Sequence, residues 1–444
     1  MKIIIVGAGE VGTHLAKLLT RENIDICLMD ENRDRLAGLD DNYDMLTRVG
    51  SPTSLHDLKN IGVKGCDLFI AVTPHESVNM TACLIATQLG AKKTIARIDN
   101  YEYLLPENKQ FFENLGLNHL IYPEVLAAGE IADSLKTSWM RYHIILAGGL
   151  LHLCIVKIRD NAELTNKPFQ SGFFKHSNYR ILAIKRDNET FIPSGQDEVK
   201  KGDLVFFICT KENIDFVREQ AGKAYRQVKN IVFMGGTRIT QKAVMSLPDD
   251  LNIKILEPNR ENCMYLSEKV QNALIINADG SNIEVLRQEG ISDADAFVAV
   301  TDNSEANIFA CLAAKQLGAA KTIAEVENIG YIPMAEGLDI GAVLNKKTIA
   351  ASYIYQLLMR SNVLSIRNLT IADAEIVELQ VTEGSRITNT KIRDAGLPRE
   401  VNIGAIVRAG EAILVNGDTQ LLPGDKVIIF CKSQMIRKLD KYFK

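Results

Sequence analysis

Short apolar runs alternate with segments of helical spacing through the amino-terminal part of the chain. Residues 2–6, 24–29, 66–73 and 94–98 each form a run about as long as a buried strand. Between them, segments such as 77–89 repeat apolar residues at the three- and four-residue spacing of a helix. Strands that alternate with helices in this way are typical of a parallel sheet, so the pattern predicts a doubly wound α/β domain.

A glycine-rich turn joins the first strand to the first helix. Gly7, Gly9 and Gly12 form a G-x-G-x-x-G pattern just before the helical segment 13–19. The first glycine allows a tight turn, the second lets backbone amides approach a pyrophosphate, and the third lets the helix pack closely on the strand. The amino end of the helix then offers N–H groups to phosphates. The pattern predicts a nucleotide site, and a purely structural glycine turn is the alternative.

Asp30 follows the second strand, where a carboxylate can accept hydrogen bonds from both hydroxyls of an adenine-linked ribose. The same carboxylate would repel a ribose 2′-phosphate, so NAD or another adenine nucleotide is favoured over NADP. NAD, NADH, ATP and ADP share the ribose diol, so Asp30 does not separate them. Loops after the later strands face the same crevice, which makes Thr73, Pro74 and Arg97 candidates. Arg97 could neutralise phosphate charge, or it could be a solvated surface cation.

The first sheet domain is repeated in the second half of the chain. The matching segments, which share one constant offset, are Cys66–Thr73 with Ala294–Thr301, Ala82–Ala86 with Ala310–Ala314, and Thr94–Ala96 with Thr322–Ala324. In the second copy Gly235 and Gly236 keep the start of the turn, but the site differs at four positions: Thr237 replaces Gly9, Thr240 replaces Gly12, Glu257 replaces Asp30 with a shift of one residue, and Glu325 replaces Arg97. Backbone approach and helix packing are both hindered by these threonines. We therefore expect an ordinary fold with an altered site, in which loss of dinucleotide binding is favoured over retention.

A shorter segment is repeated after each sheet domain. The matching segments are Ile181–Arg186 with Ile403–Arg408, and Gly202–Cys209 with Gly424–Cys431. Strand-like runs followed by closing helices at 211–220 and 433–442 indicate a small α+β module. Two segments with helical apolar spacing, 123–139 and 343–360, lead into the modules. Each is expected to cross over and pack on the neighbouring repeat, and packing on its own domain is the alternative.

The predicted organisation has six parts. They are a sheet domain at 1–122, a linking helix at 123–140, a small α+β domain at 141–222, a second sheet domain at 228–342, a second linking helix at 343–361 and a second small domain at 364–444.

Composition narrows the class of protein. Of 444 residues, 46% are hydrophobic and 24% charged, which is ordinary for globular domains, and the formal net charge is −4, so no basic surface field indicates nucleic acid. The first strand follows Met1 directly, and the most apolar run, 144–156, is too short for a bilayer, which needs ~20 residues. We therefore expect no signal peptide and no membrane insertion. Eight cysteines without a C-x-x-C pair indicate buried free thiols in a reducing cytoplasm, and the seven histidines show no metal spacing.

The chain resembles the TrkA family, the peripheral regulatory subunits of Trk potassium uptake systems, which carry tandem potassium-conductance-regulating (RCK) domains. The resemblance runs end to end and rests on Gly7-x-Gly9-x-x-Gly12, Asp30, Ala71–Thr73, Ala299–Thr301 with Glu305–Asn307, and the pairs Gly202-Asp203 and Gly424-Asp425. It implies an RCK N domain followed by an RCK C domain, twice.

The resemblance also implies a function and a site. It implies a cytoplasmic subunit at the inner face of the membrane that binds NAD, NADH, ATP or ADP, forms a dimer or a tetramer ring, and gates a TrkH-like potassium channel. The implied nucleotide site comprises Gly7, Ala8, Gly9, Glu10, Val11, Gly12, Asp30, Thr73, Pro74 and Arg97. A second site would comprise Gly235, Gly236, Thr237 and Glu257, where the threonines depart from the fuller family fingerprint.

A dehydrogenase and a gene-regulatory redox sensor are the two alternatives to a regulatory subunit. A dehydrogenase would need a proton donor beside the nicotinamide, yet no histidine is paired with an acid in a recognisable catalytic setting. A gene-regulatory redox sensor would need a DNA-reading helix and a basic face, and neither is recognisable. A glycine fingerprint by itself indicates a fold and not a chemistry. We therefore expect a regulator that is not an enzyme.

Overall fold

The computed structural model describes residues 1–20, 24–174, 178–187, 189–358, 363–369, 372 and 374–443. Residues 359–361 of the second predicted linking helix, and 370, 371, 373 and 444 of the second predicted small domain, lie outside the described residues.

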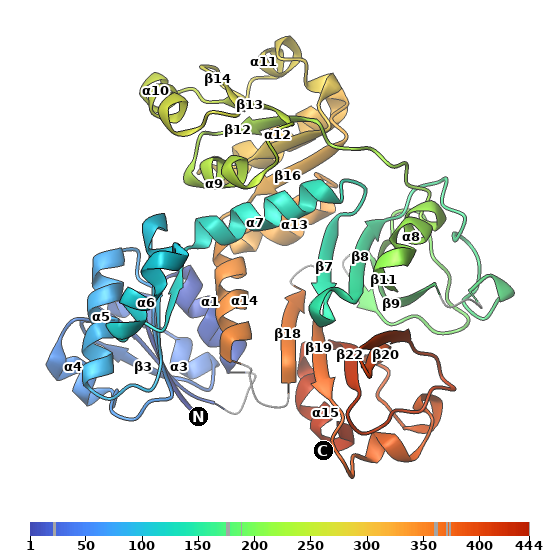
Figure 1. Ribbon diagram of the computed structural model, residues 1–444, viewed down its shortest axis with the longest axis horizontal. Helices are drawn as coiled ribbons and strands as arrows, with labels where there is room; N and C mark the ends of the chain where they lie inside the picture. Colours follow the sequence, from blue (N-terminus) through green and yellow to red (C-terminus); the bar gives the residue numbers. More distant parts are fainter. Residues whose placement is uncertain are drawn as a thin grey trace. The chain divides into compact units, whose positions relative to one another are not determined.

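The first sheet domain, coloured blue in Figure 1, is a parallel sheet. It has six strands in the order β3-β2-β1-β4-β5-β6. Its strands are β1 (Lys2–Val6), β2 (Asp25–Asp30), β3 (Leu46–Val49), β4 (Leu68–Ala71), β5 (Thr94–Arg97) and β6 (His119–Ile121). Its helices are α1 (Glu10–Leu19), α2 (Arg33–Leu36), α3 (Leu39–Asn42), α4 (Leu55–Asn60), α5 (Glu76–Gln88) and α6 (Pro106–Asn114), with a 3-10 turn η1 (Tyr101–Leu104). The strand order reverses between β1 and β4, and ligands of such sheets bind at this switch point, beyond the carboxyl ends of the strands.

The second sheet domain repeats this topology in the order β14-β13-β12-β15-β16-β17. Its strands are β12 (Asn230–Met234), β13 (Asn252–Leu256), β14 (Leu274–Ile276), β15 (Ala296–Ala299), β16 (Lys321–Glu325) and β17 (Ala342–Leu344). Its helices are α9 (Arg238–Ser246), α10 (Arg260–Lys269), α11 (Ile283–Gln288), α12 (Ser304–Leu317) and α13 (Ile332–Gly337), with η5 (Ile291–Asp293) and η6 (Ile329–Tyr331). The central strands of both sheets are largely apolar because helices cover both faces of a parallel sheet.

Each small domain is a five-stranded antiparallel sheet with a closing helix. The first comprises β7 (Tyr142–Leu146), β8 (Leu151–Lys157), β9 (Tyr179–Arg186), β10 (Glu189–Phe191), β11 (Leu204–Thr210) and α8 (Ile214–Gln220), with η2 (Ala147–Gly149), η3 (Gly172–Phe174) and η4 (Lys211–Asn213). The second comprises β18 (Val363–Leu369), β19 (Ala374–Gln380), β20 (Val401–Arg408), β21 (Glu411–Leu414), β22 (Lys426–Lys432) and α15 (Ile436–Phe443), with η8 (Arg386–Asn389), η9 (Ile392–Asp394) and η10 (Ser433–Met435). The predicted fold class, two Rossmann-like sheets each followed by a small α+β domain, is confirmed.

The two small domains share one hydrophobic core. Phe206 of β11 and Phe430 of β22 are both buried, with ring centroids 5.8 Å apart. A Cβ atom on Gly404 of β20 would overlap the side chain of Leu182 on β9. Gly404 matches Leu182 in the repeat, so a bulky residue in one copy packs against a glycine in the other.

The repeated Gly-Asp pairs form turns. Gly202 and Gly424 have φ of 89° and 90°, a conformation that favours glycine. The buried carboxylate of Asp203 accepts hydrogen bonds from Arg186 at 2.8 Å, and that of Asp425 accepts hydrogen bonds from Arg408 at 2.7 and 2.8 Å. These family motifs therefore have a structural use here.

The linking helices exchange partners between the repeats. The chain divides into one compact unit of residues 1–126 and 346–358 and another of 127–345 and 359–444. Helix α14 (Lys346–Leu358), which follows the second sheet domain, packs along α1 of the first (Figure 1, orange beside blue). Helix α7 (Pro123–Lys136) follows the first sheet domain, and beyond its first turn it belongs to the unit of the second. There buried Lys321 of β16 donates to the carbonyl oxygens of Ser134 at 2.7 Å and Met140 at 2.9 Å.

Among the described residues, no helix has both the length and the hydropathy needed to cross a membrane. In the same part of the chain, no group of three or more His, Cys, Asp and Glu side chains is arranged to hold a metal ion.

Candidate functional site

The glycine turn after β1 leaves an open space at the start of α1. Gly7 has φ of 103°, and a Cβ atom there would lie 2.9 Å from the amide nitrogen of Thr73. A Cβ atom on Gly12 would overlap the carbonyl oxygen of Gly7, so these two glycines are required by the packing of turn and helix. Gly9 differs, because a Cβ atom on it would have no described heavy atom within 4 Å. The space in front of Gly9 therefore lies where the amino end of α1 can bind phosphate oxygens.

The carboxylate of Asp30 lies beside this turn. Asp30 ends β2 and is 8% exposed. Its Oδ2 accepts a hydrogen bond from the amide of Ala8 at 2.7 Å, and its Oδ1 accepts one from the amide of Asn32 at 2.8 Å. Arg35, which is half exposed, approaches Oδ2 at 3.6 Å. Asp30 thus holds the turn in place, and its carboxylate lies at the edge of the crevice with further lone pairs for ligand hydroxyls.

Arg97 contributes a buried donor at the carboxyl end of β5. Its Nε is buried and has no hydrogen-bond partner in the part of the chain that the structure describes. A buried guanidinium donor without an acceptor is costly, and a phosphate oxygen is a suitable acceptor for it. The open space at Gly9, the carboxylate at Asp30 and this unpaired donor together fit the diol and phosphates of an adenine nucleotide.

The remaining predicted residues lie around the same turn. Ala8 and Val11 are each 5% exposed and face the interior, whereas Glu10 is exposed at the first position of α1. Pro74 is exposed in the turn after Thr73. The structure therefore places all ten residues of the first site at the carboxyl ends of the strands of one sheet.

Asn79 of α5 connects the strand ends and was missed by sequence reasoning. It is fully buried, and its Oδ1 accepts hydrogen bonds from the amide of Thr73 at 2.8 Å and from its hydroxyl at 2.7 Å. Its Nδ2 donates to the carbonyl oxygens of Thr73 and Arg97 at 2.9 and 3.0 Å. Asn307 makes the same four contacts in the second copy, so the repeated position was the available signal.

We expect Asn79→Ala to destabilise the unit of residues 1–126 and 346–358 by about 2–3 kcal/mol, because buried backbone groups lose their partners. Urea unfolding followed by circular dichroism measures this loss, and Asn114→Ala on the exposed face of α6 is the matched control. A loss no larger than that of the control would contradict the bridging role.

Glu76, at the start of α5, is a second missed residue. Its Oε2 accepts hydrogen bonds from the amides of Asp99 and Asn100 at 2.6 and 2.7 Å and so positions the loop after β5. In the second copy the hydroxyl of Ser304 accepts one such bond, from the amide of Glu327 at 2.9 Å. Neither residue type carries a recognisable motif.

The second copy keeps the turn, but side chains of α10 pack on it. Glu257 repeats the role of Asp30, since its Oε2 accepts a hydrogen bond from the amide of Gly236 at 2.9 Å. Helix α10 is longer than α2, and it brings two side chains over the turn. Asn262 donates to Glu257 Oε2 at 3.0 Å, and buried Leu266 packs so closely on Gly236 that a Cβ atom there would overlap it. With the one-residue shift that aligns Glu257 with Asp30, the position of Leu266 is occupied by Leu39 in the first copy.

The two threonines of the second copy differ in how they are accommodated. Helix α9 starts directly after Thr237, just as α1 starts after Gly9. Buried Thr240 donates its hydroxyl proton to the carbonyl oxygen of Gly235 at 2.5 Å. Thr240 therefore does not hinder helix packing, whereas the buried hydroxyl oxygen of Thr237 has no hydrogen-bond partner among the described residues.

Family models match nearly all of this architecture. The TrkA-N domain model matches residues 3–123 and 231–346, and the TrkA-C domain model matches residues 153–222 and 376–444. The chain belongs to the TrkA family. Both halves of the predicted duplication are thereby confirmed as paired TrkA-N and TrkA-C domains, and the predicted family resemblance is confirmed.

Relatives in this family span the whole chain. The chain is 30% identical over 452 residues to the Trk system potassium uptake protein TrkA of Halomonas elongata, covering 100% of this chain and 98% of that protein. It is 30% identical over 453 residues to the TrkA of Haemophilus influenzae, with the same coverage. It is also 30% identical over 457 residues to TrkA homolog 1 of Methanosarcina mazei, with full coverage of both chains.

Solved structures share the fold at lower identity. The GsuK RCK domain matches with a TM-score of 0.59 at 17% identity, covering 100% of this chain and 94% of that one. The GsuK channel bound to NAD matches with a TM-score of 0.58 at 18% identity, covering 100% and 78%. These matches show an RCK-type fold.

A residue that is distant in the sequence contacts the helix that begins at the first glycine turn. Lys347, at the start of α14, forms an ion pair with Glu10 of α1, with Nζ and Oε2 2.7 Å apart. Such a partly exposed pair contributes little stability by itself. It shows, however, that the linking helix of the second repeat reaches the helix that begins at the glycine turn.

Proposed function

We propose that this TrkA-family chain is a nucleotide-sensing regulatory subunit that gates a TrkH-like potassium channel at the inner face of the cell membrane. The observation that carries the proposal is the crevice of the first sheet domain, which combines an open glycine turn, the Asp30 carboxylate and the buried Arg97 donor. The relatives named as potassium uptake proteins support the transport role, and the GsuK structure described as bound to NAD supports the ligand class.

Each residue of the crevice has a distinct task in this proposal. Asp30 accepts hydrogen bonds from the ribose diol of NAD, NADH, ATP or ADP and orients the adenosine. Backbone amides at Gly9 and the start of α1 bind phosphate oxygens, and Arg97 neutralises their charge. Asn79 and Glu76 hold the strand-end loops so that these groups keep their positions. The bound group is a ligand here, and no residue is assigned to a reaction.

Coupling to movement is carried by α1 and α14. Helix α1 begins at the phosphate-binding turn, and α14, which packs along it, precedes the second small domain in the chain. A ligand shifts the conformational equilibrium only if it binds one arrangement better than another. A shift from 1:99 to 99:1 needs about 5.5 kcal/mol of differential affinity. Several copies in a ring would share that requirement, which favours a dimer or tetramer.

The second sheet domain is proposed to be structural. Asn262 and Leu266 cover its turn, so one nucleotide per chain is expected.

The proposal is tested by potassium flux in vesicles that contain the channel with or without this protein. We expect flux to change with added NADH or ATP only when the protein is present, and Asp30→Ala to remove that response while channel binding persists. Flux that ignores nucleotide would contradict gating. Steady loss of nicotinamide absorbance with candidate substrates would instead favour the dehydrogenase alternative.

A further inference from the structure

A cavity of about 110 Å³ lies in the unit that contains the second sheet domain. We call it the basic cavity. Its walls come from the amino ends of β16 and β17, from α12 and the loop after α13, and from the first small domain at β8 and the segment after α8. Of the described residues that line it, six are cationic and one is acidic.

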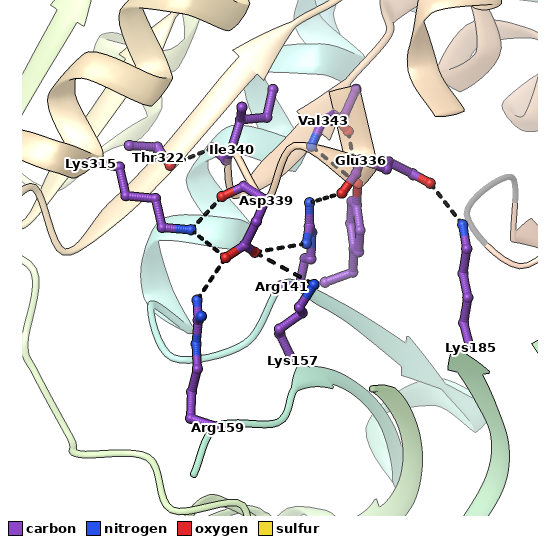
Figure 2. Close-up of polar contacts among 11 residues, drawn as sticks. Arg141, Lys157, Arg159, Lys185, Lys315, Thr322, Glu336, Asp339, Ile340 and Val343 are labelled. Atoms are coloured by element: carbon purple, nitrogen blue, oxygen red, sulfur yellow. Dashed lines mark hydrogen bonds and ion pairs between the residues drawn. The ribbon is translucent and has the colours of Figure 1, made fainter. Parts of the chain in front are cut away.

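Asp339 is the acidic residue, and four cations surround it (Figure 2). Its carboxylate lies 2.9 Å from Lys315 and 3.0 Å from Arg159, while Arg141 and Lys157 approach at 3.4 and 3.9 Å. Although burial alone would raise the pKa of Asp339, the hydrogen bond and charge of Lys315 with the charges of Arg159 and Lys157 lower it to about 2. One carboxylate thus neutralises only one of several positive charges.

A second carboxylate nearby, that of Glu336, acts on Arg141 but is already paired with a cation of its own. Glu336, close by in Figure 2, has its carboxylate paired with Lys185 at 3.1 Å, which leaves that pair neutral. The Nζ of Lys321 donates to carbonyl oxygens at the end of α7, so its hydrogen bonds are directed away from an anion in the cavity. The other five lining cations therefore share Asp339 as the one acidic residue among the described residues of the cavity wall; they are Arg141, Lys157, Arg159, Lys223 and Lys315.

Two of these cations, Arg141 and Lys223, are destabilised by this arrangement. Arg141 is 8% exposed, and its buried Nε has no hydrogen-bond partner in the part of the chain that is described. Burial lowers the pKa of Lys223 to about 8, and the like charge of Arg159 acts in the same direction. Positive charges that are held close together and partly buried are stabilised by an added anion.

We propose that the basic cavity binds a small phosphate-bearing anion. Guanidinium and ammonium groups from separate elements are the usual partners of phosphate oxygens. The volume is roughly that of three to four waters in the liquid, which suits a phosphate group or the terminal phosphates of a nucleotide, and not a whole dinucleotide.

This site is separate from the nucleotide crevice. The cavity touches Thr322 at the amino end of β16 and Ala342 at the amino end of β17. The glycine turns lie beyond the carboxyl ends of the strands, at the opposite edge of each sheet. An anion in the cavity would join the second sheet domain to the first small domain, and it should therefore stabilise this unit against heat.

Isothermal titration calorimetry of the full chain with inorganic phosphate and with pyrophosphate tests the proposal, with ionic strength held constant by sodium chloride. We expect saturable binding and a raised melting temperature. Lys223→Met and Arg159→Gln should each weaken binding by about 10-fold or more, because a charged hydrogen bond is lost. Lys109→Met on exposed α6 should change nothing.

The Gly9→Ala background separates the two sites and the two sources of phosphate, because the added methyl group would occupy the space proposed for phosphate at the glycine turn. Binding of phosphate that persists there places it outside the crevice. Competition by ADP in that background assigns the cavity to nucleotide phosphates, and lack of competition assigns it to free phosphate or pyrophosphate. Absence of saturable binding to the wild type would overturn the proposal. So would equal affinity in Lys223→Met, Arg159→Gln and Lys109→Met, with folding checked by circular dichroism.

Sulfate provides a pH-dependent readout because its charge is constant near neutrality. The groups that face Lys223 are Arg159, Lys157, Lys315 and Asp339. With a pKa of about 8, Lys223 loses its proton between about pH 7 and pH 9, so sulfate affinity should fall over this range. Lys223→Met should reduce that dependence. An unchanged pH dependence in this variant would contradict the assignment of Lys223.

Discussion

Asp30→Ala is expected to weaken binding of NADH and ATP by about 10- to 100-fold, since charged hydrogen bonds contribute roughly 1.5–3 kcal/mol. The carboxylate is nearly buried and also accepts the Ala8 amide, so its removal both deletes the ribose acceptor and loosens the glycine turn. Titration calorimetry on the full chain measures the change directly.

Glu257→Ala is the matched control for this experiment. Glu257 accepts the Gly236 amide just as Asp30 accepts the Ala8 amide, but Asn262 and Leu266 cover its turn. We therefore expect nucleotide affinity to stay at the wild-type value in Glu257→Ala. Equal losses in the two variants would show that both crevices bind nucleotide, and unchanged affinity in Asp30→Ala would remove the assignment of the first.

Gly12→Ala is expected to cost about 3 kcal/mol of stability and to abolish nucleotide binding, because the added methyl group would overlap the carbonyl oxygen of Gly7. Neither the turn nor the start of α1 can move without disturbing β1, which lies in the centre of the sheet. Thermal unfolding and calorimetry measure the two effects.

Gly9→Ala separates ligand contact from folding. Gly9 has φ of −72°, which alanine adopts freely, and a methyl group there meets no described atom within 4 Å. Stability should therefore stay close to the wild type, while nucleotide binding weakens because the methyl group occupies the space proposed for phosphate. If Gly9→Ala binds nucleotide normally, phosphate does not approach this turn.

Strand and helix assignments could be predicted because their signals are local. Apolar runs became β1, β2, β4 and β5, and the G-x-G-x-x-G spacing became a turn that two glycines must form. Asp30 could be placed beside the turn because adjacent parallel strands end at the same edge. Because the sequence repeats, the same topology could be predicted for the second half of the chain.

The covering of the second crevice could not be predicted in the same way. Thr237 and Thr240 pointed to an altered site, but the side chains that cover its turn belong to Asn262 and Leu266. Their positions depend on α10 being longer than α2, and no motif encodes that length. Asn79 was missed because a helical asparagine carries no motif of its own, and its signal in the sequence is the matching Asn307 of the second copy.

The sequence by itself determined the duplicated α/β and α+β domains, the TrkA resemblance and the first glycine turn with its acid, because periodicity, repeats and short motifs depend on the order of residues along the chain. The apolar spacing of 343–360 predicted that this helix packs on the neighbouring repeat. Only the tertiary structure decided that its partner there is α1, that Lys347 pairs with Glu10, and that cations from separate domains converge on Asp339. Those contacts join residues that are far apart in the sequence, and their formation depends on how whole surfaces pack. Packing of that kind leaves no periodic trace along the chain.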